Sequence, residues 1–322
     1  MSRPLAILIR NGPSVLAAGV FVGLLVPALA DAARPMMPAT VFIFVLGTLL
    51  RVDPAAVLAV VRRPAVSVAL PLCAIVASPV LAGLICRAAG LPPAWTLAVV
   101  LAFCAPPSSG TSAVARMLGL DAAVALVATL AAMALVPLTA PLLVQWFGRD
   151  TGVSIQPSTL ALRLLVLVGT AECAALVLRR FAKDRLAAHA GAIDAIVVVA
   201  LLVFAVATMA GMQKSIANDP HVAVAAIALA FAANLGAQCI AYLLTPGGVR
   251  TRFNVALLMG NRNVGLLWAA LDSAITPAAA LFFACAQLPI YLLPRLIQSL
   301  LPRFEALGER IGAAREPGRA SE

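Results

Sequence analysis

The sequence predicts an all-α membrane protein with ten transmembrane helices, arranged as two inverted repeats of five helices each. Three observations predict this class: an apolar composition, ten separate apolar runs, and two polar interruptions about 150 residues apart. The chain has 322 residues, of which 63% are hydrophobic and 11% charged, and its mean hydropathy is +1.04. In a soluble domain about a quarter of all residues are charged, so a water-soluble fold is excluded. Segments such as 196–209 are apolar on every side, which excludes the alternating strands of a membrane β-barrel.

Each apolar run is bounded by charges, Pro or Gly, and nine of the ten are long enough to cross a bilayer. The second run, 36–50, is short, and we expect it to tilt little or to extend into 54–61. The first run also resembles a signal peptide, because it ends in Ala28-Leu29-Ala30. We expect it to be retained, since its removal would leave nine helices and spoil the symmetry. The ten predicted runs are 13–30, 36–50, 64–86, 94–115, 121–147, 158–178, 192–212, 221–244, 253–271 and 276–299.

Lys and Arg predict the orientation of these runs. With the N-terminus inside, the inner loops hold sixteen Lys and Arg and the outer loops hold four, as the positive-inside rule requires. We therefore expect a multi-pass protein of the plasma (inner) membrane, with both termini and a tail at 303–322 in the cytoplasm. The net charge of +10 then indicates attraction to anionic membrane lipid rather than to nucleic acid. The six cysteines show no metal-binding spacing, so we expect small buried apolar residues and no metal.

The two polar interruptions lie near 106–112 and 260–265, in the fourth and ninth runs. The first and sixth runs start a similar distance apart, which predicts two halves, 1–150 and 151–302. Because five is odd, the second half enters the membrane from the opposite face. Transporters built in this way bind substrate near the midplane, where interrupted helices meet.

The fourth run contains two consecutive prolines followed by small polar residues. Prolines remove backbone donors and clash with the preceding turn, so the helix should break here. Freed backbone groups at this depth must face protein or a watery cavity, and a half-helix starting near Thr111 would direct its positive end at an anionic ligand. The alternative is a proline kink satisfied by its own hydroxyls. The candidate substrate-binding residues are Pro106, Pro107, Ser108, Ser109, Gly110, Thr111 and Ser112.

The ninth run places Asn261, Arg262 and Asn263 about nine residues from either end, near the midplane. An Arg there costs at least about 2.5 kcal/mol and must point to an interior partner. The two amides are further candidates for substrate binding. Arg262 is a candidate fixed cation, and the alternative is a structural Arg bound to carbonyls that the helix break frees.

Among the other polar residues inside predicted runs, four are candidates for a functional or structural role. Asn234 and Gln238 are four residues apart on one helix face, where they line the cavity or hold helices together. Glu172 is a deep carboxylate and a candidate proton carrier for coupling, a partner for a basic residue, or a protonated side chain beside a polar neighbour. Arg163 is five residues into the sixth run, and we expect it to extend outward as an interface anchor.

The two interrupted motifs resemble those of the bile acid:sodium symporter family. That family has C-P-G-G-T-A-S-N in its fourth span and E-x-G-x-Q-N-x-G-L-A in its ninth. The resemblance implies a core domain of spans 3–5 and 8–10, in which spans 4 and 9 cross, and a panel domain of spans 1, 2, 6 and 7. It implies alternating access by the core moving against the panel, with organic anions bound between them, commonly together with sodium. The matching residues are Cys104-Ala105-Pro106, Gly110-Thr111-Ser112 and Gly260-Asn261-Arg262-Asn263-Val264-Gly265-Leu266.

The sequence departs from the family at the residues that the resemblance assigns to sodium. Leu258 stands where the family has Glu, Arg262 where it has Gln, and the fourth-span Asn is absent. A carboxylate and two amide oxygens are lost and a fixed cation is gained, so we expect transport that is independent of sodium and no other cofactor.

The predicted function is secondary transport of organic anions, either carboxylates or steroid and bile-acid-like compounds. An inverted-repeat carrier of the auxin-efflux type is the alternative within transport. A membrane-embedded enzyme is a further alternative, but the sequence has no HExxH or GxSxG motif, and its two histidines, His189 and His221, lie outside or at the edge of the runs. We therefore expect no enzymatic activity.

Overall fold

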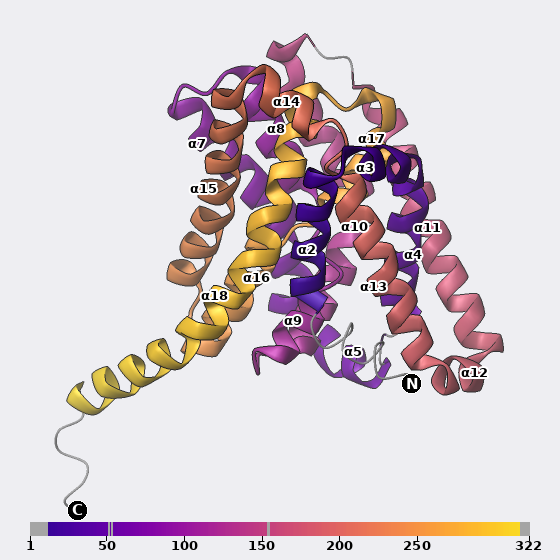
Figure 1. Ribbon diagram of the computed structural model, residues 1–322. Coiled ribbons are helices and arrows are strands. Elements are labelled where there is room, and N and C mark those ends of the chain that lie inside the picture. Colours follow the sequence, from indigo (N-terminus) through magenta and orange to yellow (C-terminus); the bar gives the residue numbers. More distant parts are fainter. Residues whose placement is uncertain (1–11, 51, 53, 153–154, 316–322) are drawn as a thin grey trace, which may run out of the picture.

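The structure is a computed structural model that describes residues 12–315, except for 51, 53 and 153–154. Regular structure in those ranges is helical (Figure 1). Seven helical segments are long and apolar enough to cross a membrane, so the chain is an integral, multi-pass membrane protein. These segments are Pro27–Leu50, Ala65–Ala88, Ala122–Gly148, Pro157–Phe181, Ala190–Asn218, Pro220–Leu244 and Pro277–Leu307. Residues 1–11 and 316–322, on which the prediction of cytoplasmic termini depends, lie outside the described residues.

Six of the seven segments match single predicted runs, whereas Pro27–Leu50 joins the end of the first run to the second run. The first, fourth and ninth runs are each divided into two shorter helices. The first run divides before Pro27, a residue that lacks the N–H needed to continue a helix. The fourth and ninth runs divide at their polar interruptions, as the sequence predicts. The shorter helices are α2 (Gly12–Leu25) and α3 (Pro27–Ala33), α8 (Pro93–Cys104) and α9 (Thr111–Met117), and α16 (Val249–Gly260) and α17 (Val264–Leu271).

One group of helices, here called the panel helices, packs together on one side of the molecule. α13 packs against both α2 and α4, and α11 packs against α4. α11 buries one stripe of residues at helical spacing, including Leu160, Leu164 and Val168, while residues such as Leu162 and Leu165 stay exposed. In a membrane the exposed face contacts lipid. The panel helices are α2, α4 (Met37–Leu50), α11 (Pro157–Phe181) and α13 (Ala190–Ala207).

The remaining long segments, here called the core helices, surround α8. Every residue of α8 from Thr96 to Cys104 is buried, as expected of a helix that is apolar all round. α7 and α10 pack against α8, α15 packs against α16, and α18 packs against α8, α15 and α16. The core helices are η2 (Ala65–Ala69), α6 (Leu70–Leu72), η3 (Cys73–Ala77), α7 (Ser78–Ala88), α8, α9, α10 (Ala122–Gly148), α15 (Pro220–Leu244), α16, α17 and α18 (Pro277–Arg315).

Short helices mark the two ends of the bundle. α5 (Pro54–Val61), α9 and α12 (Lys183–Ala188) lie at one end, here called the α12 end. α3, α14 (Met212–Asn218) and α17 lie at the other, here called the α14 end (Figure 1). The panel and core helices touch where α10 packs against α11, where α2 packs against α18, and where α17 packs against α4 and α11.

Only three of the six cysteines are buried. Cys86, Cys104 and Cys285 are buried, but Cys73, Cys173 and Cys239 are exposed. The prediction of buried cysteines is therefore wrong for half of them. An apolar residue in a membrane helix can face lipid as readily as protein, and hydropathy does not distinguish the two.

Candidate functional site

The two helix breaks meet in the interior of the core helices. α8 ends at Cys104 and α9 begins at Thr111, while α16 ends at Gly260 and α17 begins at Val264. The Ser108 N–H donates to the Asn261 carbonyl at 2.7 Å, and the Asn263 N–H donates to the Pro106 carbonyl at 2.8 Å. These bonds form an antiparallel bridge between Pro107 and Arg262. Two stretches of irregular backbone thus satisfy part of each other's hydrogen bonding away from water.

Arg262 lies where the two helix breaks meet, a place here called the crossing, and is only 4% exposed. Its Nε donates to the Met259 carbonyl at 2.8 Å. Its Nη1 donates to the Ala74 carbonyl at 2.8 Å and to the Ala105 carbonyl at 3.4 Å, and its Nη2 donates to Ser78 Oγ at 2.8 Å. None of the ion pairs found among the described residues includes Arg262. The partners of its charge are therefore the carbonyl and hydroxyl dipoles of three chain segments.

Helix breaks leave these carbonyls free. In the π-helical turn η3, the Ser78 N–H bonds to the Cys73 carbonyl, so the next donor in that pattern belongs to Pro79, which has no N–H. The Ala74 carbonyl is thereby left without a helical partner. Met259 lies one residue before the end of α16, and the Asn263 N–H that a continuing helix would offer it bonds to Pro106 instead.

The Ala105 carbonyl lies just beyond the end of α8 and likewise has no following turn to supply a donor. The guanidinium also lies 5.2 Å from the ring centroid of Phe103, within the range of a cation–π contact. Arg262 thus donates hydrogen bonds to acceptors in the third, fourth and ninth predicted spans.

Asn234 and Gln238 from α15 are also engaged at the crossing. Asn234 Nδ2 donates to the Gly260 carbonyl at 2.8 Å, and Gln238 Nε2 donates to Asn234 Oδ1 at 2.5 Å. Both side chains are 6% exposed. This close approach needs glycine at position 260, because a Cβ there would lie 2.5 Å from Gln238 Cγ. Asn234 thus caps α16, and Gln238 supports it by donating to Asn234 from the same face of α15.

Four buried polar atoms at the breaks have no hydrogen-bond partner among the described residues: Ser109 Oγ, Thr111 Oγ1, Asn261 Oδ1 and Asn263 Nδ2. Each of the four residues is less than 9% exposed. Asn263 Oδ1, by contrast, accepts a bond from the Leu266 N–H at 3.3 Å and caps α17. A buried polar atom left unpaired costs about 1–3 kcal/mol, so this cluster has unused capacity for hydrogen bonds with a ligand.

Other predicted site residues make fewer contacts at the crossing. Ser112 is half-buried in α9, and the Gly110 N–H lies 3.4 Å from Ser108 Oγ. Glu172 is half-buried on α11, a panel helix, with no hydrogen bond or ion pair to another described residue. Within the described part of the chain, Glu172 makes no hydrogen bond or ion pair to the residues at the crossing.

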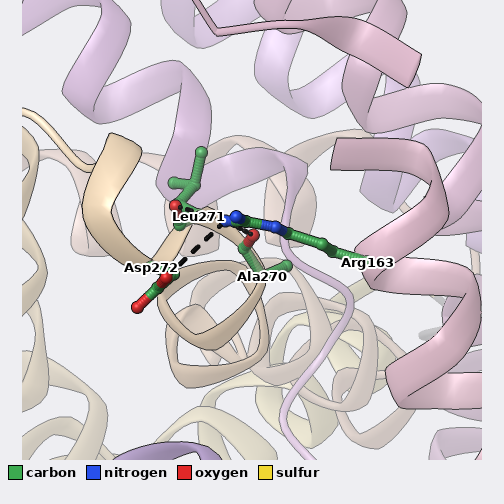
Figure 2. A network of polar contacts seen from close by, with 4 residues as sticks. All are labelled: Arg163, Ala270, Leu271 and Asp272. Carbon is green, nitrogen blue, oxygen red and sulfur yellow. Dashed lines mark hydrogen bonds and ion pairs between the residues drawn. The ribbon is translucent and has the colours of Figure 1, made fainter. Parts of the chain in front are cut away.

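Arg163, which the sequence predicts to be an interface anchor, bonds the end of a second helix. Its Nη1 donates to the last two carbonyls of α17, those of Ala270 at 3.3 Å and Leu271 at 3.1 Å, and lies 3.9 Å from Asp272 Oδ2. Figure 2 shows the side chain extending from α11 to the end of α17. The prediction placed Arg163 by its depth alone, whereas its partners lie more than a hundred residues away in the sequence.

A narrow cavity lies beside the crossing, lined by Phe103, Asn234, Gly260 and Arg262 together with α18 residues such as Phe282. Its volume of about 20 Å³ is close to the space that one water molecule needs. An organic anion does not fit there in this conformation, so binding one on this side would need the helices to move.

Comparison with protein-family models and with curated proteins found no match to the chain.

Proposed function

We propose that the chain is a secondary active transporter of organic anions that works by alternating access in the plasma (inner) membrane. The observation that carries the proposal is the pair of broken helices, bonded to each other through main-chain atoms and carrying four unpartnered buried polar atoms. Irregular backbone within a membrane is tolerated where it lies inside protein or lines a cavity. Discontinuous helices that meet in this way commonly form the substrate sites of secondary transporters.

The helix contacts support two inverted repeats, 1–150 and 151–302. In the first half, α7 and α10 pack against α8; at the corresponding places in the second half, α15 and α18 pack against α16. Across the halves, α13 packs against α2 as α11 packs against α4, and α18 packs against α8 as α10 packs against α16. We take the panel helices as one moving part and the core helices as the other, the division implied by the resemblance to bile acid:sodium symporters.

In this proposal the α12 end faces the cytoplasm. That end holds Arg179 and Arg180 in the last turn of α11 and Arg116 in the last turn of α9. The α14 end carries fewer basic residues, among them Arg87 and Arg149. The difference follows the positive-inside rule and supports a cytoplasmic position for the tail at 303–322.

An anion is the ligand that the charges favour. Arg262 brings a buried positive charge to the crossing and has no carboxylate partner among the described residues. The hydroxyls of Ser109 and Thr111 and the Nδ2 of Asn263 are donors that a carboxylate would accept. We assign substrate binding to these residues and Asn261, with the backbone of 106–112 as the wall of the site.

Arg262 itself is assigned as a fixed cation rather than as the substrate clamp. Its donors already point at three main-chain carbonyls and a hydroxyl, so a direct grip on substrate would require it to release them. A permanent guanidinium at this place neutralises the free carbonyl dipoles at the helix ends, as a bound sodium ion would. Coupling to sodium is then not needed, and Glu172 is the carboxylate we propose for proton coupling.

A thermal-shift screen of purified protein tests the proposal, because a ligand that binds only the folded state raises the unfolding temperature. Carboxylates and steroid conjugates are expected to stabilise the protein equally in sodium and in potassium buffers. Stabilisation that requires sodium would contradict the assignment of Arg262. Absence of stabilisation by every anion tested, with stabilisation by cations or neutral compounds instead, would contradict the substrate class.

The variant Thr111→Val tests the site itself. It removes a buried hydroxyl that has no partner, so the free protein is expected to be as stable as the wild type or more stable, while the affinity for the anion found in the screen falls about tenfold, equivalent to about 1.4 kcal/mol. Isothermal titration and thermal unfolding measure the two effects.

Thr129→Val is the matched control. Thr129 is also a buried helical threonine, 2% exposed, but its hydroxyl donates to the Ala125 carbonyl at 2.8 Å. This control is expected to leave anion affinity unchanged. Equal affinities for wild type and Thr111→Val would remove Thr111 from the proposed site.

A further inference from the structure

The contact between Arg163 and α17 joins a panel helix to a core helix. Ala270 and Leu271 are the last two residues of α17, so their carbonyls have no following helical turn to supply donors. The Arg163 guanidinium, from the second turn of α11, donates to both (Figure 2). A cation at this place also complements the negative end of the helix dipole.

The turn that receives Arg163 has a strained backbone. Asp272 follows α17 directly and has φ 49° and ψ −119°. Among the described residues it is the one non-glycine residue with a positive φ. An L-residue pays for this conformation with steric strain, which persists only where the surroundings hold it in place.

At the α12 end, comparable arginine contacts stay within one group of helices. Arg179, in the last turn of the same helix α11, donates to the Leu49 carbonyl at 3.5 Å, and Leu49 belongs to the panel helix α4. Arg250 contacts the Gly119 carbonyl at 3.0 Å and Glu305 at 2.6 Å, both in the core part of the chain. Movement of the panel against the core would leave these contacts intact but would break that of Arg163.

We propose that Arg163 is a latch that holds the panel and core helices together at the α14 end and releases when the protein opens to that side. The inference rests on the proposed alternating access. The latch is reversible, because the Arg163 side chain is 41% exposed and water can replace its carbonyl partners after release. Relaxation of the strained Asp272 backbone favours the released state, while the two carbonyl bonds favour the closed one, so the contact acts as a two-state element.

Spin labels report the opening directly. Cysteines for labelling replace Ala89 and Ser158 in a background without the six native cysteines. Both positions are exposed; Ala89 follows α7 in the core and Ser158 lies in the first turn of the panel helix α11. Pulsed dipolar spectroscopy without substrate gives the populations at short and long distances between these labels.

Arg163→Ala is expected to raise the ratio of long to short distances about tenfold, because two hydrogen bonds from a charged donor are lost. Arg179→Ala is the matched control, since it removes a similar bond to a helix-terminal carbonyl from the other end of the same helix. The control is expected to leave the ratio unchanged. An unchanged ratio in Arg163→Ala, or an equal change in Arg179→Ala, would overturn the latch.

Asp272→Gly gives an opposite and independent result. Glycine adopts the backbone conformation of Asp272 without strain, and the carbonyls that bind Arg163 remain. The ion pair between Arg163 and Asp272 is also lost, but an exposed pair at 3.9 Å contributes little to stability. The closed state is stabilised, so the long-distance population is expected to fall below that of the wild type. A rise of this population in Asp272→Gly would overturn the role assigned to strain, even if Arg163→Ala does not fold.

These outcomes separate the latch from the proposed function. If the distances do not respond but anions still stabilise the protein, the latch is wrong and the transport proposal stands. If the distances respond as expected but no anion binds or is transported, the latch stands and the proposed substrate class is wrong.

Discussion

Arg262→Gln is expected to lose at least about 3 kcal/mol of unfolding free energy, because several buried oxygens lose their donor and each buried acceptor left unpaired costs about 1–3 kcal/mol. The guanidinium donates to four oxygen acceptors from three chain segments, and the shorter neutral amide cannot reach them all. Arg262→Lys keeps the charge but not the planar fork of donors, so it is expected to retain part of the stability. Chemical unfolding in mixed micelles measures both losses.

Sodium is expected to restore part of the stability of Arg262→Gln, because the vacated carbonyl oxygens can bind a small cation and binding to the folded state stabilises it. Arg252→Gln is the control: Arg252 also donates to a carbonyl, that of Gly247 at 3.0 Å, but it is only half-buried and should lose less than about 1 kcal/mol.

The alternative role for Arg262, a direct grip on the substrate carboxylate, predicts a different pattern. Both Arg262 variants would then fold normally and bind the anion at least about tenfold more weakly, a loss of about 1.4 kcal/mol or more. Normal folding with normal binding in both variants would refute any functional role for this residue.

Gly260→Ala is expected to destabilise the protein by about 1–3 kcal/mol, as overpacking of a tight interior does. The new Cβ would lie 2.5 Å from Gln238 Cγ and 2.8 Å from Asn234 Oδ1, so both amides would have to leave the break that they support. Gln238→Ala in the same chain removes the closest atoms and is expected to recover part of the loss. Thermal unfolding of the two single variants and the double variant measures this coupling.

Gly236→Ala is the matched control for that series. Gly236 also lies on α15, but a Cβ at its position meets nothing within 4 Å. Replacing a helical glycine by alanine in open space is expected to be neutral or stabilising. An equal loss of stability in Gly236→Ala and Gly260→Ala would show that the close approach at the break is not the cause.

The positions of the helices and of both breaks follow from the sequence, because they depend on local rules. Apolar runs indicate where helices lie, and the prolines at 106 and 107 remove donors wherever the chain is placed. The short polar segment around Arg262 likewise indicated an interruption. The division at Pro27 was not predicted, although a single proline between two apolar stretches was the available signal.

The partners of Arg262 and Arg163 could not be predicted, because they depend on long-range packing. The Ala74 carbonyl lies 188 residues from Arg262 in the chain and is free only because π-helical turns precede Pro79, a detail that hydropathy does not encode. Asn234 and Gln238 were placed on one helix face correctly, as their mutual hydrogen bond confirms. Their contact with Gly260 required knowledge of which helices pack together.

Uptake into proteoliposomes tests the central claim most directly. Purified protein is reconstituted, and accumulation of the labelled anion found in the screen is followed with sodium or potassium as the external cation at equal ionic strength. We predict saturable uptake that is the same in both cations, is reduced by Thr111→Val and is unchanged by Thr129→Val. Uptake no greater than in protein-free liposomes for every anion that stabilises the protein would contradict the assignment of the crossing as a transport site.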